Sequence, residues 1–150
     1  MALYYAIWAC NVEYVDILLN SGVDPNEHHD YTPFMFAAAN SNDRDGESII
    51  RMFIDANVDI NCRDDNGWTA LMHTVNKQKS TEATVKMLID AGADTTNIFK
   101  YAHKDKKKFL YDYIILPHKI TFSLGRRDPN SIVSKLPREI CKVILEYLEH

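Results

Sequence analysis

Apolar positions along the first 97 residues recur at helical spacing in three segments, 2–26, 32–61 and 69–97. In the second half of each segment they fall at i, i+3 and i+4, which is typical of a helix buried along one face. These positions are Val15, Leu18 and Leu19, then Ile50, Phe53 and Ile54, then Val85, Leu88 and Ile89. A shorter apolar stretch precedes each of them, so the pattern predicts three pairs of short helices.

The three segments also end alike, in GVDPN, NVDIN and GADTT. Gly22, Asn57 and Gly92 stand 35 residues apart at the expected helix ends, where a left-handed backbone suits glycine or asparagine. Thr32 before Pro33 is a typical start for a helix, because the hydroxyl caps it and proline has no N–H to satisfy there. The segment Asp64-Asp65-Asn66-Gly67 predicts a tight turn between units.

The stretches TPFMFAA and GWTALMH, each followed by a helix and the shared ending, resemble ankyrin repeats. The resemblance implies an all-α ankyrin-repeat solenoid with repeats at about 1–28, 29–61 and 62–96 and a degenerate capping repeat at 97–116. Met35 and Met72 stand where that family usually has histidine. The first unit has two interpretations, an N-terminal cap or a repeat within a longer array.

Beyond the repeats, we expect a linker over 117–131 and a short C-terminal helix over 132–150. The segment SKLPREICKVILEYL resembles the opening helix of the F-box and the F-box-like ending of poxviral ankyrin (PRANC) proteins and of similar effectors of intracellular pathogens. That resemblance implies contact with Skp1, the adaptor of cullin–RING ubiquitin ligases, through Leu136, Pro137, Glu139, Ile140, Ile144, Leu145 and Leu148. The alternative is a plain helix that caps the solenoid.

Composition and charge narrow the function. The chain has 150 residues, 46% of them hydrophobic, a net charge of −4 and no apolar stretch long enough to span a membrane. Three widely spaced cysteines without a CxxC pair favour a reducing compartment. The basic run 104–108 is most simply a solvated helix face, so binding of nucleic acid is weakly supported.

No residue pattern predicts catalysis, a metal or a cofactor. The paired His28 and His29 fall in a predicted connection, where they are most simply solvent-exposed turn residues. A calcium loop that places Gly46 at its sixth position would begin at Ser41 and end at Met52, so it lacks the necessary carboxylates. We therefore expect a protein without enzymatic activity.

Large rings recur at the positions that line the concave face of such a solenoid. Aromatic side chains bury much area at little cost in rotamer entropy, so they are typical anchors of protein interfaces. The predicted target-binding residues are Tyr5, Trp8, Tyr31, Phe36, Trp68 and His73. The alternatives are packing between neighbouring hairpins for Tyr31 and Trp68, and burial in the core for Phe36.

Together these patterns predict a protein–protein interaction adaptor. It would hold a protein target on its concave face and recruit a ubiquitin ligase through the C-terminal helix. An alternative from another class is a stoichiometric inhibitor of a host signalling protein or transcription factor, whose last helix is only a cap. The resemblance implies a cytoplasmic location, in the host cytosol for a pathogen protein, with the nucleus as an alternative.

Overall fold

The structure is a computed structural model that describes residues 1–27, 31–41 and 44–116. The predicted linker and C-terminal helix, and with them every predicted Skp1-contact residue, lie outside the described residues. His28 and His29 lie outside them as well. The described part divides into two compact units, which begin at Met1 and Lys104.

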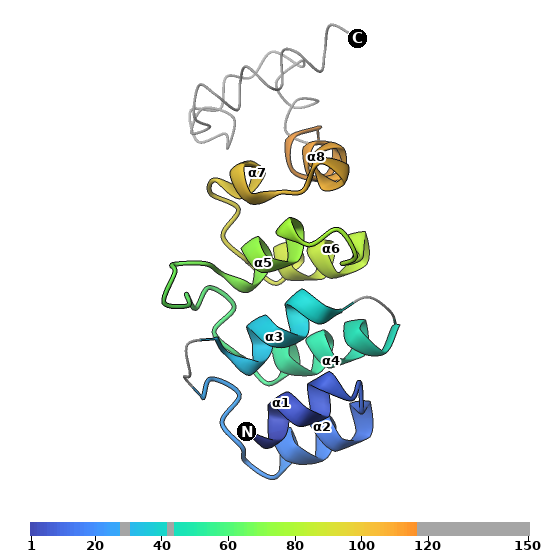
Figure 1. Cartoon of the computed structure of the whole chain (residues 1–150), viewed down its shortest axis with the longest axis vertical. Coiled ribbons are helices and arrows are strands. Elements are labelled where there is room, and N and C mark those ends of the chain that lie inside the picture. Colours follow the sequence, from blue (N-terminus) through green and yellow to red (C-terminus); the bar gives the residue numbers. More distant parts are fainter. Residues whose placement is uncertain (28–30, 42–43, 117–150) are drawn as a thin grey trace, which may run out of the picture. The chain divides into compact units, whose positions relative to one another are not determined.

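The first unit is a stack of helical hairpins (Figure 1). The hairpins are α1 (Ala2–Trp8) with α2 (Val12–Asn20), α3 (Pro33–Asn40) with α4 (Arg44–Asp55), and α5 (Ala70–Asn76) with α6 (Glu82–Asp90). The short α7 (Ile98–Tyr101) follows and packs on α5. No strand occurs in the described residues, so the all-α solenoid predicted from the sequence is confirmed.

The predicted helix signals are present. Thr32 and Thr69 accept hydrogen bonds at their Oγ1 atoms from the backbone N–H groups of Met35 and Met72, at 3.2 and 3.3 Å. These caps satisfy donors that have no partner within the helix. At the other end of each hairpin the backbone is left-handed, with φ of 86° at Gly22, 55° at Asn57 and 92° at Gly92. The repeated endings therefore mark where each second helix stops.

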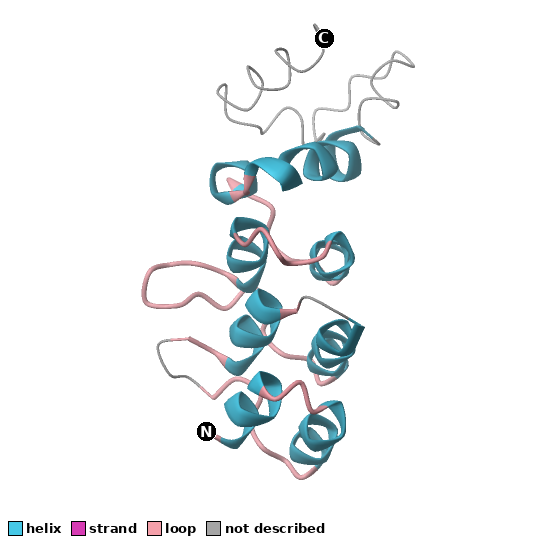
Figure 2. Cartoon of the chain, turned by 45° about the vertical axis from the view of Figure 1, so that its right-hand side comes forward, coloured by secondary structure: helices cyan, strands magenta, loops and turns pink. Residues whose placement is uncertain are grey.

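Apolar side chains fill the space within and between the hairpins. Of the predicted helix stripe, Val15, Leu18, Ile50, Phe53, Val85 and Leu88 are buried. The third position of each stripe, at Leu19, Ile54 and Ile89, is only partly buried. The first helices add Leu3, Phe34 and Leu71, each at most 1% exposed. Each first helix contacts the first helix of the next hairpin, and the second helices do likewise (Figures 1 and 2). The core is thus continuous along the stack and is built from repeated contacts between neighbouring hairpins.

Asparagine side chains join the loops of successive hairpins. Asn26 accepts a hydrogen bond from the backbone N–H of Asp59 at 2.9 Å, and Asn61 accepts one from that of Asp94 at 2.7 Å. The Asn61 amide also donates to the Gly92 carbonyl at 3.1 Å. These bonds hold the loops of successive hairpins in register.

The second unit is described by itself. It contains α8 (Lys104–Leu110), which continues into the π-helical turn η1 (Tyr111–Ile115). The rings of Phe109 and Tyr113 stack within it, with centroids 5.6 Å apart. The predicted degenerate cap, 97–116, is therefore divided between the two units. Within the basic run 104–108, Lys104 and Lys108 are exposed as expected, but Lys106 is buried.

Gly46 lies inside α4 at a point of close approach. A Cβ atom at Gly46 would lie 2.6 Å from the Cα atom of Ser41, closer than real Cβ atoms come to backbone. Alanine normally stabilises a helix relative to glycine by about 1 kcal/mol. We predict that Gly46→Ala instead lowers the free energy of unfolding by about 1–3 kcal/mol, because Ser41 must move. Urea denaturation measures this change.

The matched control is Asp45→Ala, at the exposed neighbouring position of the same helix. It removes one first-turn acid and is expected to cost less than about 1 kcal/mol. A Gly46→Ala chain more stable than the unchanged protein would contradict the close approach.

Candidate protein-binding face

A row of rings crosses the first unit from one hairpin to the next. We call it the aromatic ladder; its members are Tyr4, Phe36, Tyr31, His73, Trp68 and Tyr101. Successive ring centroids are separated by 5.9, 6.4, 4.8, 5.1 and 5.1 Å. Every member is partly exposed, so the ladder is both a packing element and an accessible surface.

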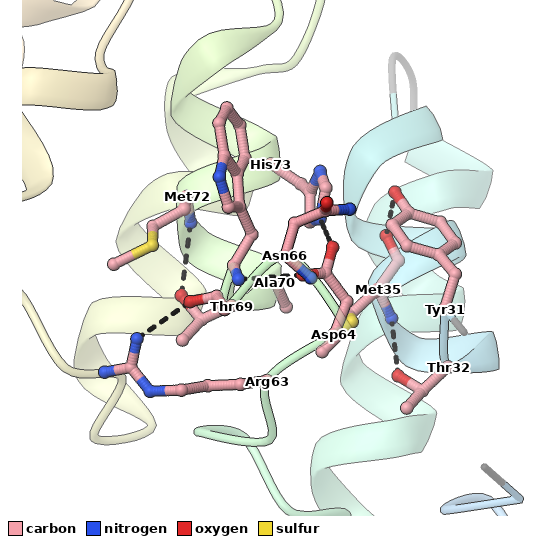
Figure 3. A network of polar contacts seen from close by, with 12 residues as sticks. Tyr31, Thr32, Met35, Arg63, Asp64, Asn66, Thr69, Ala70, Met72 and His73 are labelled. Carbon is pink, nitrogen blue, oxygen red and sulfur yellow. Dashed lines mark hydrogen bonds and ion pairs between the residues drawn. The ribbon is translucent and has the colours of Figure 1, made fainter. Parts of the chain in front are cut away.

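Asp64 fixes the centre of this ladder (Figure 3). Its Oδ1 atom accepts hydrogen bonds from the backbone N–H groups of Trp68 at 2.8 Å and Asn66 at 2.9 Å. Its Oδ2 atom lies 2.7 Å from Nε2 of His73. The Gly67 N–H closes the predicted tight turn by donating to the Asp64 carbonyl at 2.8 Å, with a φ of 76° at Gly67. One carboxylate thus positions both the turn and two ladder rings.

The surroundings of Asp64 favour its charged form. Burial by itself would raise the pKa of the carboxyl, but the hydrogen bonds from Trp68, His73 and Asn66 outweigh burial and hold that pKa below its ordinary value of 3.8. The neighbouring Tyr31 has its pKa raised, first by burial and then by the negative charge of Asp64. The Tyr31 hydroxyl stays protonated and donates to the Met35 carbonyl at 3.2 Å.

The predicted target-binding residues fall into two groups. Tyr5 and Trp8 on α1 are strongly exposed, at 69% and 78%. Four others belong to the aromatic ladder and are partly exposed: Tyr31, Phe36, Trp68 and His73. The alternative of packing between hairpins holds for Tyr31 and Trp68, because their rings contact those of His73 and Tyr101. Their role in target binding stays a prediction. The alternative of burial in the core was wrong for Phe36, because its side chain is partly exposed and its ring lies beside those of Tyr4 and Tyr31.

Sequence reasoning missed three residues of this face. Tyr4 donates a hydrogen bond from its hydroxyl to the Tyr31 carbonyl, across the boundary between two repeats. Tyr101 extends the ladder onto α7, and Asp64 anchors it. The signal for Asp64 was present, since it opens the predicted turn five residues before the capping Thr69, but its second role toward His73 depends on the fold.

The described residues were also compared with the requirements of a metal site and of a membrane span. A search of 1–27, 31–41 and 44–116 finds no group of His, Cys, Asp and Glu side chains placed to hold a metal ion. None of the described helices is long and apolar enough to span a membrane. An open hollow at the ends of α2 and α4 is lined by Asp16, Asp24 and Asp55 and contains no member of the aromatic ladder.

Comparison with known families agrees with this architecture. The family model described as "Ankyrin repeats (3 copies)" matches residues 34–112, just over half of the chain. The chain therefore belongs to the ankyrin-repeat family, a class of non-enzymatic modules for protein–protein interaction. No curated protein matches the sequence.

The anchoring role of Asp64 predicts a pH dependence of stability. Because its pKa is lower in the folded protein than in the unfolded chain, the stabilisation is fully present above pH 3.8 and is lost as the pH falls through the folded value. We predict that the free energy of unfolding falls more between pH 6 and pH 3 in the unchanged protein than in Asp64→Asn. Urea denaturation at the two pH values measures the difference.

Asp64→Asn serves as the control for the charge alone. Its amide oxygen can still accept hydrogen bonds from the N–H groups of Trp68 and Asn66, but it has no negative charge to lose as the pH falls. Equal pH dependence of the two chains would show that the carboxylate charge contributes nothing to stability.

Proposed function

We propose that this protein is an adaptor that captures a protein target on the face formed by α1, α3 and α5 and their loops. The observation that carries the proposal is the 78% exposure of Trp8, the last residue of α1. A tryptophan that contributes little to its own core represents a large apolar area available to a partner. The aromatic ladder presents further partly exposed rings along the stack.

The energetics of such a face suit a moderate affinity. Burial of one large aromatic side chain contributes roughly 2–3 kcal/mol. Two or three of these residues would then supply much of the roughly 8 kcal/mol of a micromolar complex. The ladder is held by contacts between its rings and by Asp64, so its side chains lose little freedom on binding.

The proposal extends to the C-terminal segment through its sequence alone. The F-box-like segment SKLPREICKVILEYL would recruit Skp1 and so bring the captured target to a cullin–RING ubiquitin ligase. In this role the protein would act in the cytosol, of the host in the case of a pathogen protein, or in the nucleus. If the chain does not recruit Skp1, the alternative is a stoichiometric inhibitor whose last helix is only a cap.

The target-binding face is tested with Trp8→Ala. The side chain is exposed, so we expect a thermal midpoint within about 2 °C of the unchanged protein and at least a tenfold loss of co-purified target, measured by quantitative mass spectrometry. Ala83→Ser at an exposed position of α6 is the matched control and should retain the target. Full retention of every co-purified protein by Trp8→Ala would count against this face.

The ligase arm is tested with purified Skp1 by isothermal titration calorimetry. We expect binding by the unchanged chain and at least a tenfold weaker binding by the double variant Leu145→Ser, Leu148→Ser, at an unchanged thermal midpoint. A lower midpoint in the double variant would instead indicate a capping helix. Absence of Skp1 binding by the unchanged chain would leave only the inhibitor.

A further inference from the structure

The first hairpin exposes large apolar side chains at positions that the next two hairpins cover. In the 35-residue register of the second helices, Tyr14 corresponds to Ile49 and Thr84. Tyr14 is 45% exposed, whereas Ile49 is 1% and Thr84 0% exposed. One helical turn further on, Ile17 is 53% exposed, whereas its counterparts Met52 and Met87 are less exposed. Exposure at these positions therefore depends on which hairpin carries the residue, and not on the type of side chain.

In the third hairpin the counterparts, Thr84 and Met87, contact the preceding hairpin. The Thr84 hydroxyl lies 3.0 Å from that of Ser41, which directly follows α3 of the second hairpin. The sulfur of Met87 lies 3.8 Å from an Arg51 guanidinium nitrogen on α4. This side of a second helix is therefore the side that faces the hairpin before it. Tyr14 and Ile17 present the same side of α2.

The first helices follow the same rule. Tyr5 occupies the position of Phe36 in α3 and His73 in α5. The Phe36 ring lies against Tyr4 of the hairpin before it, and the His73 ring lies 4.8 Å from that of Tyr31, in the preceding connection. Tyr5 has no such ring beside it among the described residues and is 69% exposed. The position that Phe36 and His73 fill beside a neighbouring ring is thus uncovered at Tyr5.

The polar contacts between loops also stop at the first hairpin. The N–H groups of Asp59 and Asp94 donate to Asn26 and Asn61 of the preceding loop. Asp24 stands at the same register position, and no side chain in the described part of the chain accepts from its N–H. Apolar and polar contacts therefore end at one surface, which we call the N-terminal face and define by Tyr5, Tyr14, Ile17 and the Asp24 N–H.

We propose that the N-terminal face binds a further helical hairpin of the ankyrin type, packed on α1 and α2 as the second hairpin packs on the first. Its loop would carry an asparagine that accepts from the Asp24 N–H, as Asn26 and Asn61 do from their partners. A repeat that ends a solenoid needs a polar outer face, and this one carries two tyrosines and an isoleucine. The first hairpin thus has the surface of an interior repeat and continues an interface used twice in the same molecule.

Charge decides against a second copy of the same hairpin as the occupant. Residues 1–27 contain four acidic side chains and neither lysine nor arginine. Two of them, Glu13 and Asp16, are exposed on α2 beside Tyr14 and Ile17. Two such faces brought together would place like charges close to one another. A hairpin with a basic residue at the position of Arg51, which lies next to Met87 in the stack, would relieve this repulsion.

The test uses the second repeat of this protein as the probe. A copy of residues 32–68 is fused directly before residue 1 of the full chain, with Met1→Thr to restore the helix cap. We expect one cooperative transition by circular dichroism, with a thermal midpoint raised by about 5 °C or more, because neighbouring repeats stabilise one another. Hydrogen exchange at the Asp24 N–H should slow at least tenfold.

The double variant Tyr14→Lys, Ile17→Lys separates a specific interface from added length. In the unfused chain both side chains are exposed, so the midpoint should change by less than about 2 °C. In the fused chain the same substitutions should abolish the gain. Separate unfolding of the fused repeat, or a gain that survives the lysine substitutions, would overturn the proposal.

Analytical ultracentrifugation of the unfused chain provides the remaining arm. A monomer is expected at micromolar concentration. A dimer that the lysine substitutions dissociate would show that a second copy of this chain occupies the N-terminal face, and it would overturn the proposal. Neither result depends on Trp8, so the target-binding face stands or fails separately.

Discussion

The packing of one helical hairpin on the next is the interaction on which the rest of this structure depends. A pair of helices of seven to twelve residues cannot bury its apolar side chains alone, and isolated helices of that length are marginal in water. Stacking buries Leu3, Phe34 and Leu71 in one layer and Ile50, Phe53 and Leu88 in the other. The loops, the aromatic ladder and the exposed end of the stack all take their positions from this repetition.

The aromatic ladder shows how a stacking interface can also become a binding surface. Its rings are fixed on one side by the neighbouring repeat and by Asp64, and they remain partly exposed on the other. A side chain fixed in this way contributes both to folding and to recognition. The two contributions compete at Trp68, whose ring contacts those of His73 and Tyr101. They compete less at Trp8, which is 78% exposed.

Local signals in the sequence were enough to predict the repeats. The caps at Thr32 and Thr69 and the left-handed Gly22, Asn57 and Gly92 are properties of short segments, and the structure contains all of them. The apolar stripe of each second helix is buried at its first two positions only. Contacts between repeats were not predictable in this way. The Tyr4 hydroxyl reaches the carbonyl of Tyr31, 27 residues away, and Asn26 reaches Asp59, 33 residues away. No local pattern marks such pairs before the hairpins are stacked.

The same reasoning explains why the sequence alone allows two interpretations of the first hairpin, an N-terminal cap or a repeat within a longer array. Tyr14 and Ile17 continue the apolar character of α2, so periodicity alone cannot tell a covered side from an exposed one. Comparison of register positions can, because Ile49 and Thr84 show what that side of the helix contacts inside the stack. A polar residue would suffice at position 14 if water were its normal neighbour. A tyrosine at 45% exposure and an isoleucine at 53% instead retain the chemistry of an interface between repeats.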